Sequence, residues 1–276
     1  MKPLTILSLG AGVQSTCLAL MAAKGEVAKV DAAIFADTQA EPEATYRHLD
    51  GLKKMLPFPV HTVTAGNIME KSLTPQKAKT GEDYIRNTIP AYTKDRETGS
   101  AGMLLRKCTA DYKITPITRK IRELLGKANF RDGRVLVVQY IGISLDEATR
   151  AKEARQKYIE HRFPLLDLRM TRHDCIRWLE KNGYEIPPKS ACIMCPYHNN
   201  NQWRNLRDNA PDEFRRAAKF EEDWNKAARA DKRTTRTRGQ IYLHRSLKPL
   251  DEVDLSTDVE RGQLTFLDEC DGMCGN

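Results

Sequence analysis

Two cysteines, Cys192 and Cys195, have the C-x-x-C spacing that lets two thiolates reach one metal ion from a single turn. Cys108 is the third thiolate that we expect at this metal site, and His198 is a candidate for a fourth ligand. The same spacing occurs in redox dithiols, and it can also join two thiols that share no function. The cysteines therefore predict a metal site, with a redox pair or two unrelated thiols as the alternatives.

A glycine-rich stretch, SLGAGVQST at residues 8–16, joins an apolar run expected to form a strand to an apolar run expected to form a helix. The backbone N–H groups of such a turn and the N-terminus of the helix suit a phosphate group. The stretch lacks the lysine of a P-loop NTPase and the third glycine of a dinucleotide-binding fingerprint, so a tight turn without a ligand is the alternative. The candidate phosphate-binding residues are Ser8, Gly10, Ala11, Gly12, Gln14, Ser15 and Thr16.

Charged side chains follow two further apolar runs that we expect to form strands. Asp37 comes directly after residues 30–36, where it would bind a ribose hydroxyl, an adenine amino group or Mg²⁺, or else cap a helix. Gly142 ends another run and is followed by Glu147 and Arg150, which would orient phosphates and metal or form only a surface ion pair. Because the carboxyl ends of parallel strands meet at one edge of a sheet, these side chains are expected to lie on one edge.

The expected strands and helices alternate along the chain, which predicts an α/β fold with a doubly wound, mostly parallel sheet. The strands are expected at residues 4–9, 30–36, 58–64 and 134–143, and the helices at 13–24, 42–56, 115–126 and 171–183. In the last of these helices, Thr171 is the expected N-cap and Asp174 lies in the first turn. We expect a nucleotide-binding domain at 1–185, with a lid or small insert at about 66–112, and a helical region at 186–276.

The composition and net charge of the chain indicate a globular protein with acidic partners. The chain has 276 residues, is 40% hydrophobic and carries a formal net charge of +8, which favours acidic partners such as nucleotides or nucleic acid. Within it, the basic segment 226–238 would suit RNA or DNA, or would form a solvated surface. No stretch approaches the roughly 20 apolar residues of a membrane helix, and no signal peptide is evident. We therefore expect a cytoplasmic protein whose seven cysteines are not structural disulfides.

Taken in order, these motifs resemble those of the PP-loop ATP pyrophosphatases, the adenine nucleotide α-hydrolase-like proteins of the HUP type. Within that superfamily they resemble the phosphoadenosine phosphosulfate (PAPS) reductase-like group. The resemblance covers residues 8–196. It is carried by the glycine loop, Asp37-Thr38 with Thr45 and Tyr46, Cys108 before Lys113 and Pro116, Gly142 with Glu147 and Arg150, Pro164-Leu165, and the C-x-x-C pair.

The resemblance implies an enzyme that binds ATP and Mg²⁺. Its glycine loop and Thr38 would hold the nucleotide, Asp37 would lie at the ribose or adenine, and Lys113 and Arg150 would balance the polyphosphate charge. The implied reaction is adenylation of an acceptor with release of pyrophosphate, followed by sulfur transfer. A [4Fe–4S] cluster on the three thiolates would present the sulfur, or Zn²⁺ would replace it if His198 is a ligand.

The chain also departs from the pattern of this group. Ala11, Gln14, Ser144 and Leu168 stand where the group has glycine, aspartate, arginine and tryptophan. A single cysteine, Cys108, stands where a cluster-bearing reductase has a pair, so a fourth cluster ligand would have to come from His198 or from the C-terminal tail.

Two alternative functions follow from the tail and from the basic segment. The ending ECDGMCGN resembles the mobile Glu-Cys-Gly tail of a PAPS reductase, in which case Cys270 is the nucleophile of sulfonucleotide (PAPS or APS) reduction and Cys274 resolves the intermediate. The other alternative is a zinc-containing nucleic-acid-binding protein with an inactive PP-loop, whose binding would fall steeply with salt.

Overall fold

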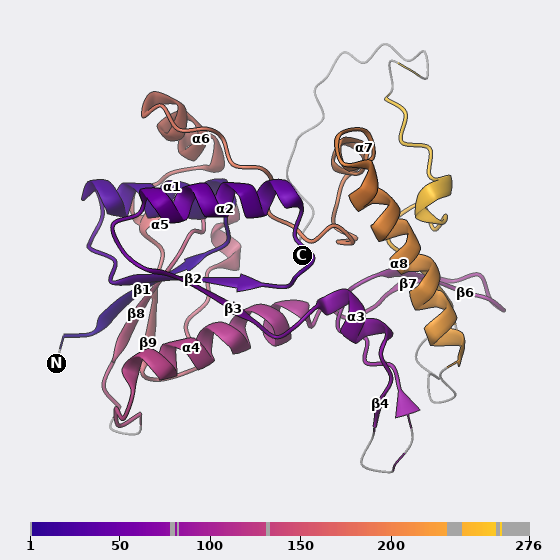
Figure 1. Cartoon of the computed structure of the whole chain (residues 1–276), viewed down its shortest axis with the longest axis horizontal. Coiled ribbons are helices and arrows are strands. Elements are labelled where there is room, and N and C mark those ends of the chain that lie inside the picture. The colour runs from indigo at the N-terminus through magenta and orange to yellow at the C-terminus, as the bar shows by residue number, and fades with distance from the viewer. Residues whose placement is uncertain are drawn as a thin grey trace. The chain divides into compact units, whose positions relative to one another are not determined.

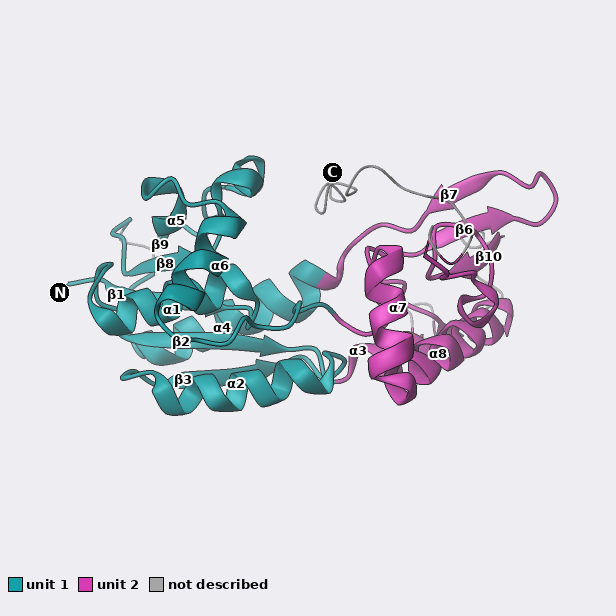
Figure 2. Ribbon diagram, turned by 90° about the horizontal axis from the view of Figure 1, so that it is seen from above, with its two compact units in different colours: residues 1–66, 109–191 teal, residues 67–108, 192–276 magenta. Residues whose placement is uncertain are grey.

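The computed structural model describes residues 2–77, 81, 83–130, 133–230, 239–257 and 260. Within it the chain forms two compact units, coloured separately in Figure 2. The first unit comprises residues 1–66 and 109–191, and the second comprises 67–108 and 192–276. Most of the segment expected as an insert of the first domain thus groups with the C-terminal region.

A five-stranded parallel sheet forms the centre of the first unit (Figure 1). Its strands lie in the order β3-β2-β1-β8-β9, and Leu7 of β1 is paired with Ala33 on one side and Tyr140 on the other. This order confirms the doubly wound α/β fold. The strands are β1 (Leu4–Leu9), β2 (Ala32–Asp37), β3 (Val60–Thr64), β8 (Val137–Ile141) and β9 (Ile159–Arg162).

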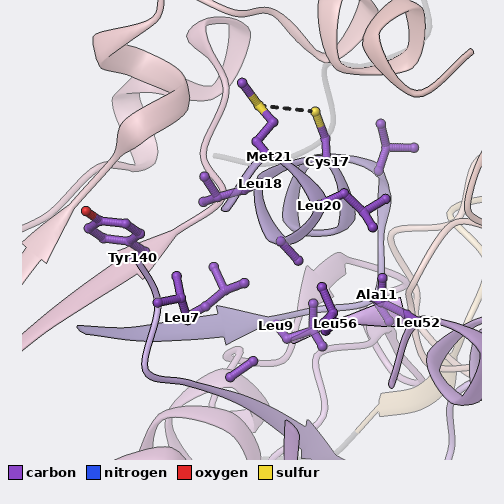
Figure 3. Packing of buried hydrophobic residues seen from close by; sticks show 14 of the residues in the cluster. Leu7, Leu9, Ala11, Cys17, Leu18, Leu20, Met21, Leu52, Leu56 and Tyr140 are labelled. Atoms are coloured by element: carbon purple, nitrogen blue, oxygen red, sulfur yellow. Dashed lines mark hydrogen bonds between the residues drawn. The ribbon is translucent and has the colours of Figure 1, made fainter. Parts of the chain in front are cut away.

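Helices cover both faces of this sheet because its strands are apolar on both sides. Leu7 and Leu9 pack in one buried cluster with residues of α1 and α2 (Figure 3) and also of α5 and α6, whereas Ile6 packs on the other face with Ile121 of α4. The helices are α1 (Val13–Lys24), α2 (Glu43–Met55), α4 (Thr115–Leu125), α5 (Pro164–Asp167) and α6 (Arg172–Lys181). A π-helical segment, η1 (Thr109–Ile114), leads into α4, and a 3₁₀ segment, η2 (Leu145–Arg150), follows β8.

The start of α6 is closed by the capping interaction that the sequence predicts. The Thr171 hydroxyl accepts a hydrogen bond from the Asp174 backbone N–H at 3.2 Å, and the Asp174 carboxylate accepts one from the Thr171 N–H at 2.8 Å. Hydrogen bonds from the hydroxyl and the N–H of Thr171 hold the pKa of Asp174 well below its usual range.

Replacing Thr171 by alanine is expected to destabilise the first unit by about 1 kcal/mol, because α6 loses its side-chain cap. Urea unfolding at pH 7 measures this cost, and Thr171→Ser, which keeps the hydroxyl, should restore most of it. Since the folded pKa of Asp174 is depressed, its contribution is present above the usual value of 3.8 and is lost as the pH falls below that value. A cost that is equal in the alanine and serine variants would contradict the capping role.

The second unit combines helices with small antiparallel sheets. Its helices are α3 (Ile68–Leu73), α7 (Asn200–Asn209) and α8 (Pro211–Ala230), with a 3₁₀ turn η3 (Leu250–Glu252). Its three-stranded sheet has the order β10-β6-β7, from β10 (Gly239–Tyr242), β6 (Tyr92–Asp95) and β7 (Ala101–Met103), and β4 (Gln76–Lys77) pairs with β5 (Asp83–Tyr84).

Backbone pairing between distant segments explains why residues 67–108 join the C-terminal region. Strand β6 pairs with β10, which lies more than a hundred residues further along the chain. The Asn225 side chain of α8 makes two hydrogen bonds with the backbone of Ile241 in β10. Its amide nitrogen donates to the Ile241 carbonyl at 2.8 Å, and its amide oxygen accepts from the Ile241 N–H at 2.8 Å. In the part of the chain that the structure describes, no helix is both long and apolar enough to cross a membrane.

Candidate functional site

The direction of the sheet connections changes at β1. From β1 the chain runs outward through β2 to β3 on one side, and it later returns to pair β8 with the other side of β1. In open parallel sheets, ligands bind outside the carboxyl ends of the strands at such a switch point. The loop after β1 and the loop after β8 are the two segments that meet there.

The loop after β1 presents the start of α1 to this edge. The Gly10 N–H donates to the Ser15 hydroxyl at 3.1 Å, and that hydroxyl donates to the Gly12 carbonyl at 3.2 Å, so Ser15 holds the loop in shape. Gly12 is the N-cap of α1, and in the described residues α1 has neither a side-chain cap nor an acidic residue in its first turn. The N-terminal N–H groups of a helix in this state suit an anion.

Ala11 adopts a left-handed conformation, with a φ of 56°. Glycine takes this conformation at no steric cost, whereas alanine takes it with some strain. The methyl group of Ala11 is fully buried in the cluster around Leu52 and Leu56 (Figure 3). The departure from glycine at this position therefore keeps the backbone shape of the loop and adds to the core.

The loop after β8 lies directly against the first turn of α1. A Cβ atom on Gly142 would lie 3.0 Å from both the N and the Cα atom of Ser15 and 3.1 Å from the Gln14 carbonyl carbon. The Gln14 amide nitrogen lies 3.4 Å from the Ser144 hydroxyl and 3.4 Å from a Glu147 carboxylate oxygen. The structure thus gives Gly142 a packing role: the two loops approach as closely as they do because it has no side chain.

Two of the residues that depart from the pattern of the resembled group contact each other here, since the Gln14 and Ser144 side chains are hydrogen-bonded. Arg150, further along the same loop, forms an ion pair with Glu147, as the surface-pair alternative expects, and the orientation of phosphates by these two side chains stays a prediction.

Asp37 ends β2 and is held by two donors. Its Oδ1 atom accepts from the Gln39 N–H at 2.7 Å and from the Tyr46 hydroxyl at 2.8 Å. Burial and the hydrogen bond to Asp37 raise the pKa of Tyr46, so this hydroxyl stays protonated as a donor. Thr38, the next residue, is buried. The carboxylate is therefore oriented by its neighbours at the edge where a ribose or adenine would lie.

Two residues of the glycine stretch use their hydroxyls elsewhere. The Ser8 hydroxyl accepts from the Gln139 amide at 2.6 Å, which joins β1 to β8. The Thr16 hydroxyl lies 3.0 Å from Nε2 of His48 on α2. Burial lowers the pKa of His48, which favours the neutral imidazole in this contact. In this structure, then, Ser8 and Thr16 connect elements of the fold.

Two polar residues at this edge, Glu41 and Ser190, were missed in the sequence, and the role of Tyr46 as a hydrogen-bond donor was not predicted. The Glu41 side chain is only 1% exposed and lies 3.3 Å from the Lys113 ammonium. The Ser190 hydroxyl lies 3.4 Å from its other carboxylate oxygen. Glu41, Lys113 and Ser190 are far apart in the sequence, and the only local signal was a glutamate two residues before the start of α2.

The cysteines of the proposed metal site lie in the second unit and are half-buried. The Cys195 N–H donates to the Cys192 carbonyl at 2.9 Å, so the C-x-x-C pair forms a tight turn. Burial raises the pKa of Tyr197, the Arg106 guanidinium 5.4 Å from its ring centre opposes this rise, and Cys195 and Cys108 add to it. Cys108 and Cys195 thus both raise the pKa of the Tyr197 hydroxyl.

His198 and the C-terminal cysteines are the candidates for a fourth ligand of the proposed metal site. The Nε2 atom of His198 lies 3.0 Å from the Cys192 carbonyl oxygen. Over the described ranges, no three His, Cys, Asp or Glu side chains form a group that could hold a metal ion. Cys270 and Cys274 lie outside the described residues, as does most of the basic segment 226–238. Lys226, which is described, pairs with Glu222 on the surface of α8.

The fold and this edge define a doubly wound α/β domain with a glycine loop at its switch point. No family model matches the chain, and no curated protein matches it. A solved structure of phosphoadenylyl-sulfate (PAPS) reductase from Candida auris, in complex with phosphate, is similar to it with a TM-score of 0.43 and 12% sequence identity. The match covers 68% of this chain and 76% of that one, and our fold assignment rests on the strand order itself.

Proposed function

We propose that the chain is an enzyme of the PAPS reductase-like PP-loop type that binds ATP at the carboxyl edge of the first unit. The observation that carries this proposal is the start of α1, which faces the switch point without a side-chain cap among the described residues. Helices α6 and α7 are closed by capping boxes, whereas α2 and α4 lack a side-chain cap as α1 does, so what distinguishes α1 is its place at the switch point. An uncapped helix start beside a glycine loop suits phosphate oxygens.

The proposed reaction is adenylation followed by sulfur transfer. An oxygen of the acceptor attacks the α-phosphorus of ATP, the bond between the α- and β-phosphates breaks, and pyrophosphate leaves. Sulfur then attacks the activated carbon, and AMP leaves with the acceptor oxygen. The N–H groups of the glycine loop would stabilise the charge of the first transition state, with Lys113 and Arg150 as cations and Asp37 on the nucleoside side.

Two groups would complete this chemistry. Bound Mg²⁺ would neutralise part of the polyphosphate charge. Thiolates are ligands of iron–sulfur clusters and of zinc, but the described structure does not bring Cys108, Cys192 and Cys195 together as a group that could hold a metal ion, so these ligands stay a prediction from the sequence.

Replacing Asp37 by alanine is expected to weaken ATP binding by at least about tenfold, because the nucleoside loses a half-buried, oriented polar partner. Isothermal titration with ATP and with PAPS measures this, together with an assay of pyrophosphate release. Asp31→Ala is the matched control, since Asp31 lies at the opposite end of the same strand and binds the Thr5 N–H. Equal affinities in the two variants would contradict the proposed site. If wild-type protein binds PAPS and releases sulfite but does not bind ATP, the reductase alternative with Cys270 holds instead.

Anaerobic purification with metal analysis tests the cysteine ligands. Cys192→Ser and Cys195→Ser should each lose the bound metal, whereas Cys270→Ser should keep it. A brown protein with roughly four irons per chain indicates the cluster, and about one zinc indicates a structural site. Full metal content in both of the first two variants would rule out these ligands. Assays of pyrophosphate release with RNA and with small acceptors then identify the acceptor class.

A further inference from the structure

A buried carboxylate lies beside the glycine loop. Glu41 is in the segment between β2 and α2, and its side chain is 1% exposed. Taking a carboxylate out of water is costly unless a cation or hydrogen-bond donors compensate. Here Lys113 lies 3.3 Å from one carboxylate oxygen and the Ser190 hydroxyl lies 3.4 Å from the other. Both partners come from distant parts of the chain, so the fold assembles this cluster.

Two contacts, one through Ser190 and one through Tyr46, connect Glu41 to the proposed nucleotide site. A Cβ atom on Gly12 would lie 3.6 Å from the Cβ atom of Ser190, so Ser190 packs directly against the glycine loop. On the other side, the Tyr46 hydroxyl that donates to Asp37 also makes a hydrogen bond with the Glu41 backbone. Glu41 therefore joins the phosphate side and the nucleoside side of one edge.

We propose that Glu41 is a positioning residue that fixes the direction of the Lys113 ammonium and holds Ser190 beside the glycine loop, and that its negative charge weakens the ground-state binding of ATP. This inference rests on the proposed function of the same edge. A carboxylate near a polyanion repels it, so the position of Glu41 is unfavourable for affinity alone. Glu41 instead favours turnover, because it fixes the direction of the Lys113 ammonium. A cation held in place stabilises the charge that develops in the transition state better than one that must reorganise.

This proposal predicts opposite effects on binding and turnover. Glu41→Gln removes the charge and keeps the shape, so the Kd for ATP should fall by about fivefold. At the same time kcat for pyrophosphate release should fall by at least about tenfold, because Lys113 loses its charged partner. A residue that only supported the fold would not tighten binding when replaced.

The matched control is Asp50→Asn. Asp50 is an exposed carboxylate on α2 that lies 3.4 Å from Lys53, so the variant loses the same charge and a similar ion pair away from the site. Its Kd and kcat should both stay within about twofold of the wild-type values. Glu41→Asp separates charge from position: it keeps the charge on a shorter side chain, so Kd should stay within about twofold while kcat falls by about tenfold.

Titration calorimetry with ATP and the pyrophosphate assay distinguish the outcomes. Tighter binding with slower turnover in Glu41→Gln supports the positioning role. An unchanged or weaker affinity in Glu41→Gln overturns this role, and so does a wild-type kcat in Glu41→Asp. If Glu41→Gln does not fold, the kcat of Glu41→Asp decides the question. If wild-type protein neither binds ATP nor releases pyrophosphate, the proposed function itself is wrong. The measurement on wild type therefore distinguishes that outcome from a failure of the positioning role of Glu41.

Discussion

Gly142→Ala should destabilise the first unit by about 1–3 kcal/mol and should weaken ATP binding more strongly than its effect on stability explains. The added methyl group would lie 3.0 Å from backbone atoms of Ser15, a distance that requires the loop after β8 and the start of α1 to separate. Backbone atoms in a buried contact cannot rotate away as a flexible side chain can. The displacement would move the N–H groups proposed to bind phosphate and would lengthen the contact between Gln14 and Ser144.

Thermal unfolding and ATP titration of the same sample measure both effects. Gly51→Ala is the control, because Gly51 lies on the exposed side of α2 and a methyl group there would meet nothing within 4 Å of it among the described residues. Alanine in a helix interior should stabilise this unit by about 0.5–1 kcal/mol and should leave the affinity unchanged. Unchanged stability and affinity in Gly142→Ala would show that the two loops separate without cost.

Local patterns in the sequence predict the centre of the first unit well. Residues 4–37 alternate between apolar strand and helix with clear turn residues, and their βαβ order follows from that alternation alone. Thr171 and Asp174 predict the start of α6 for the same reason, since a cap depends on a few neighbouring residues. The glycine loop, too, is a local feature, which is why its place at a strand-to-helix turn could be predicted.

Features that depend on distant partners could not be predicted. Strand β9 has four residues, three of which are polar, as suits the edge of a sheet, so its sequence has no apolar pattern. Strand β6 is equally polar and β10 is only four residues long, so neither pattern predicts their pairing, which Asn225 of α8 supports through its hydrogen bonds to Ile241. Glu41 became recognisable as a site residue only once Lys113 and Ser190 were seen around it. The cysteine tail lies outside the described residues, so its proposed role stays a prediction.

The second unit contains a carboxylate whose loss should have an effect as large as that of Gly142. Glu221 on α8 is buried, and its two oxygens accept hydrogen bonds from the backbone N–H groups of Leu243 at 2.5 Å and Leu250 at 3.0 Å. Burial raises the pKa of Glu221 to about 7, with Asp251 and Glu252 adding to the rise and the two N–H donors opposing it. Glu221→Ala should cost about 2–5 kcal/mol, because two buried N–H groups lose their acceptors and a cavity forms.

The raised pKa of Glu221 also determines how its contribution to the free energy of unfolding changes with pH. Between the usual value of 4.5 and about 7, the folded state binds more protons than the unfolded state, so the contribution of Glu221 to stability decreases as the pH rises through this range. The decrease amounts to about 3 kcal/mol in total. Burial lowers the pKa of His244, which acts in the opposite direction, but that effect is shared by wild type and variants and cancels in their difference.

Glu221→Gln isolates this effect, because the amide cannot titrate and keeps one of the two acceptors. The variant should be less stable than wild type at pH 5 by about 1–3 kcal/mol, and because wild type loses a similar amount as the pH rises to 8, the difference should fall close to zero or change sign. Urea unfolding followed by tryptophan fluorescence measures it, since Trp203 and Trp224 are both fully buried in this unit. A stability difference that is constant between pH 5 and 8 would mean that Glu221 is ionised throughout that range, held as an anion by the N–H groups of Leu243 and Leu250.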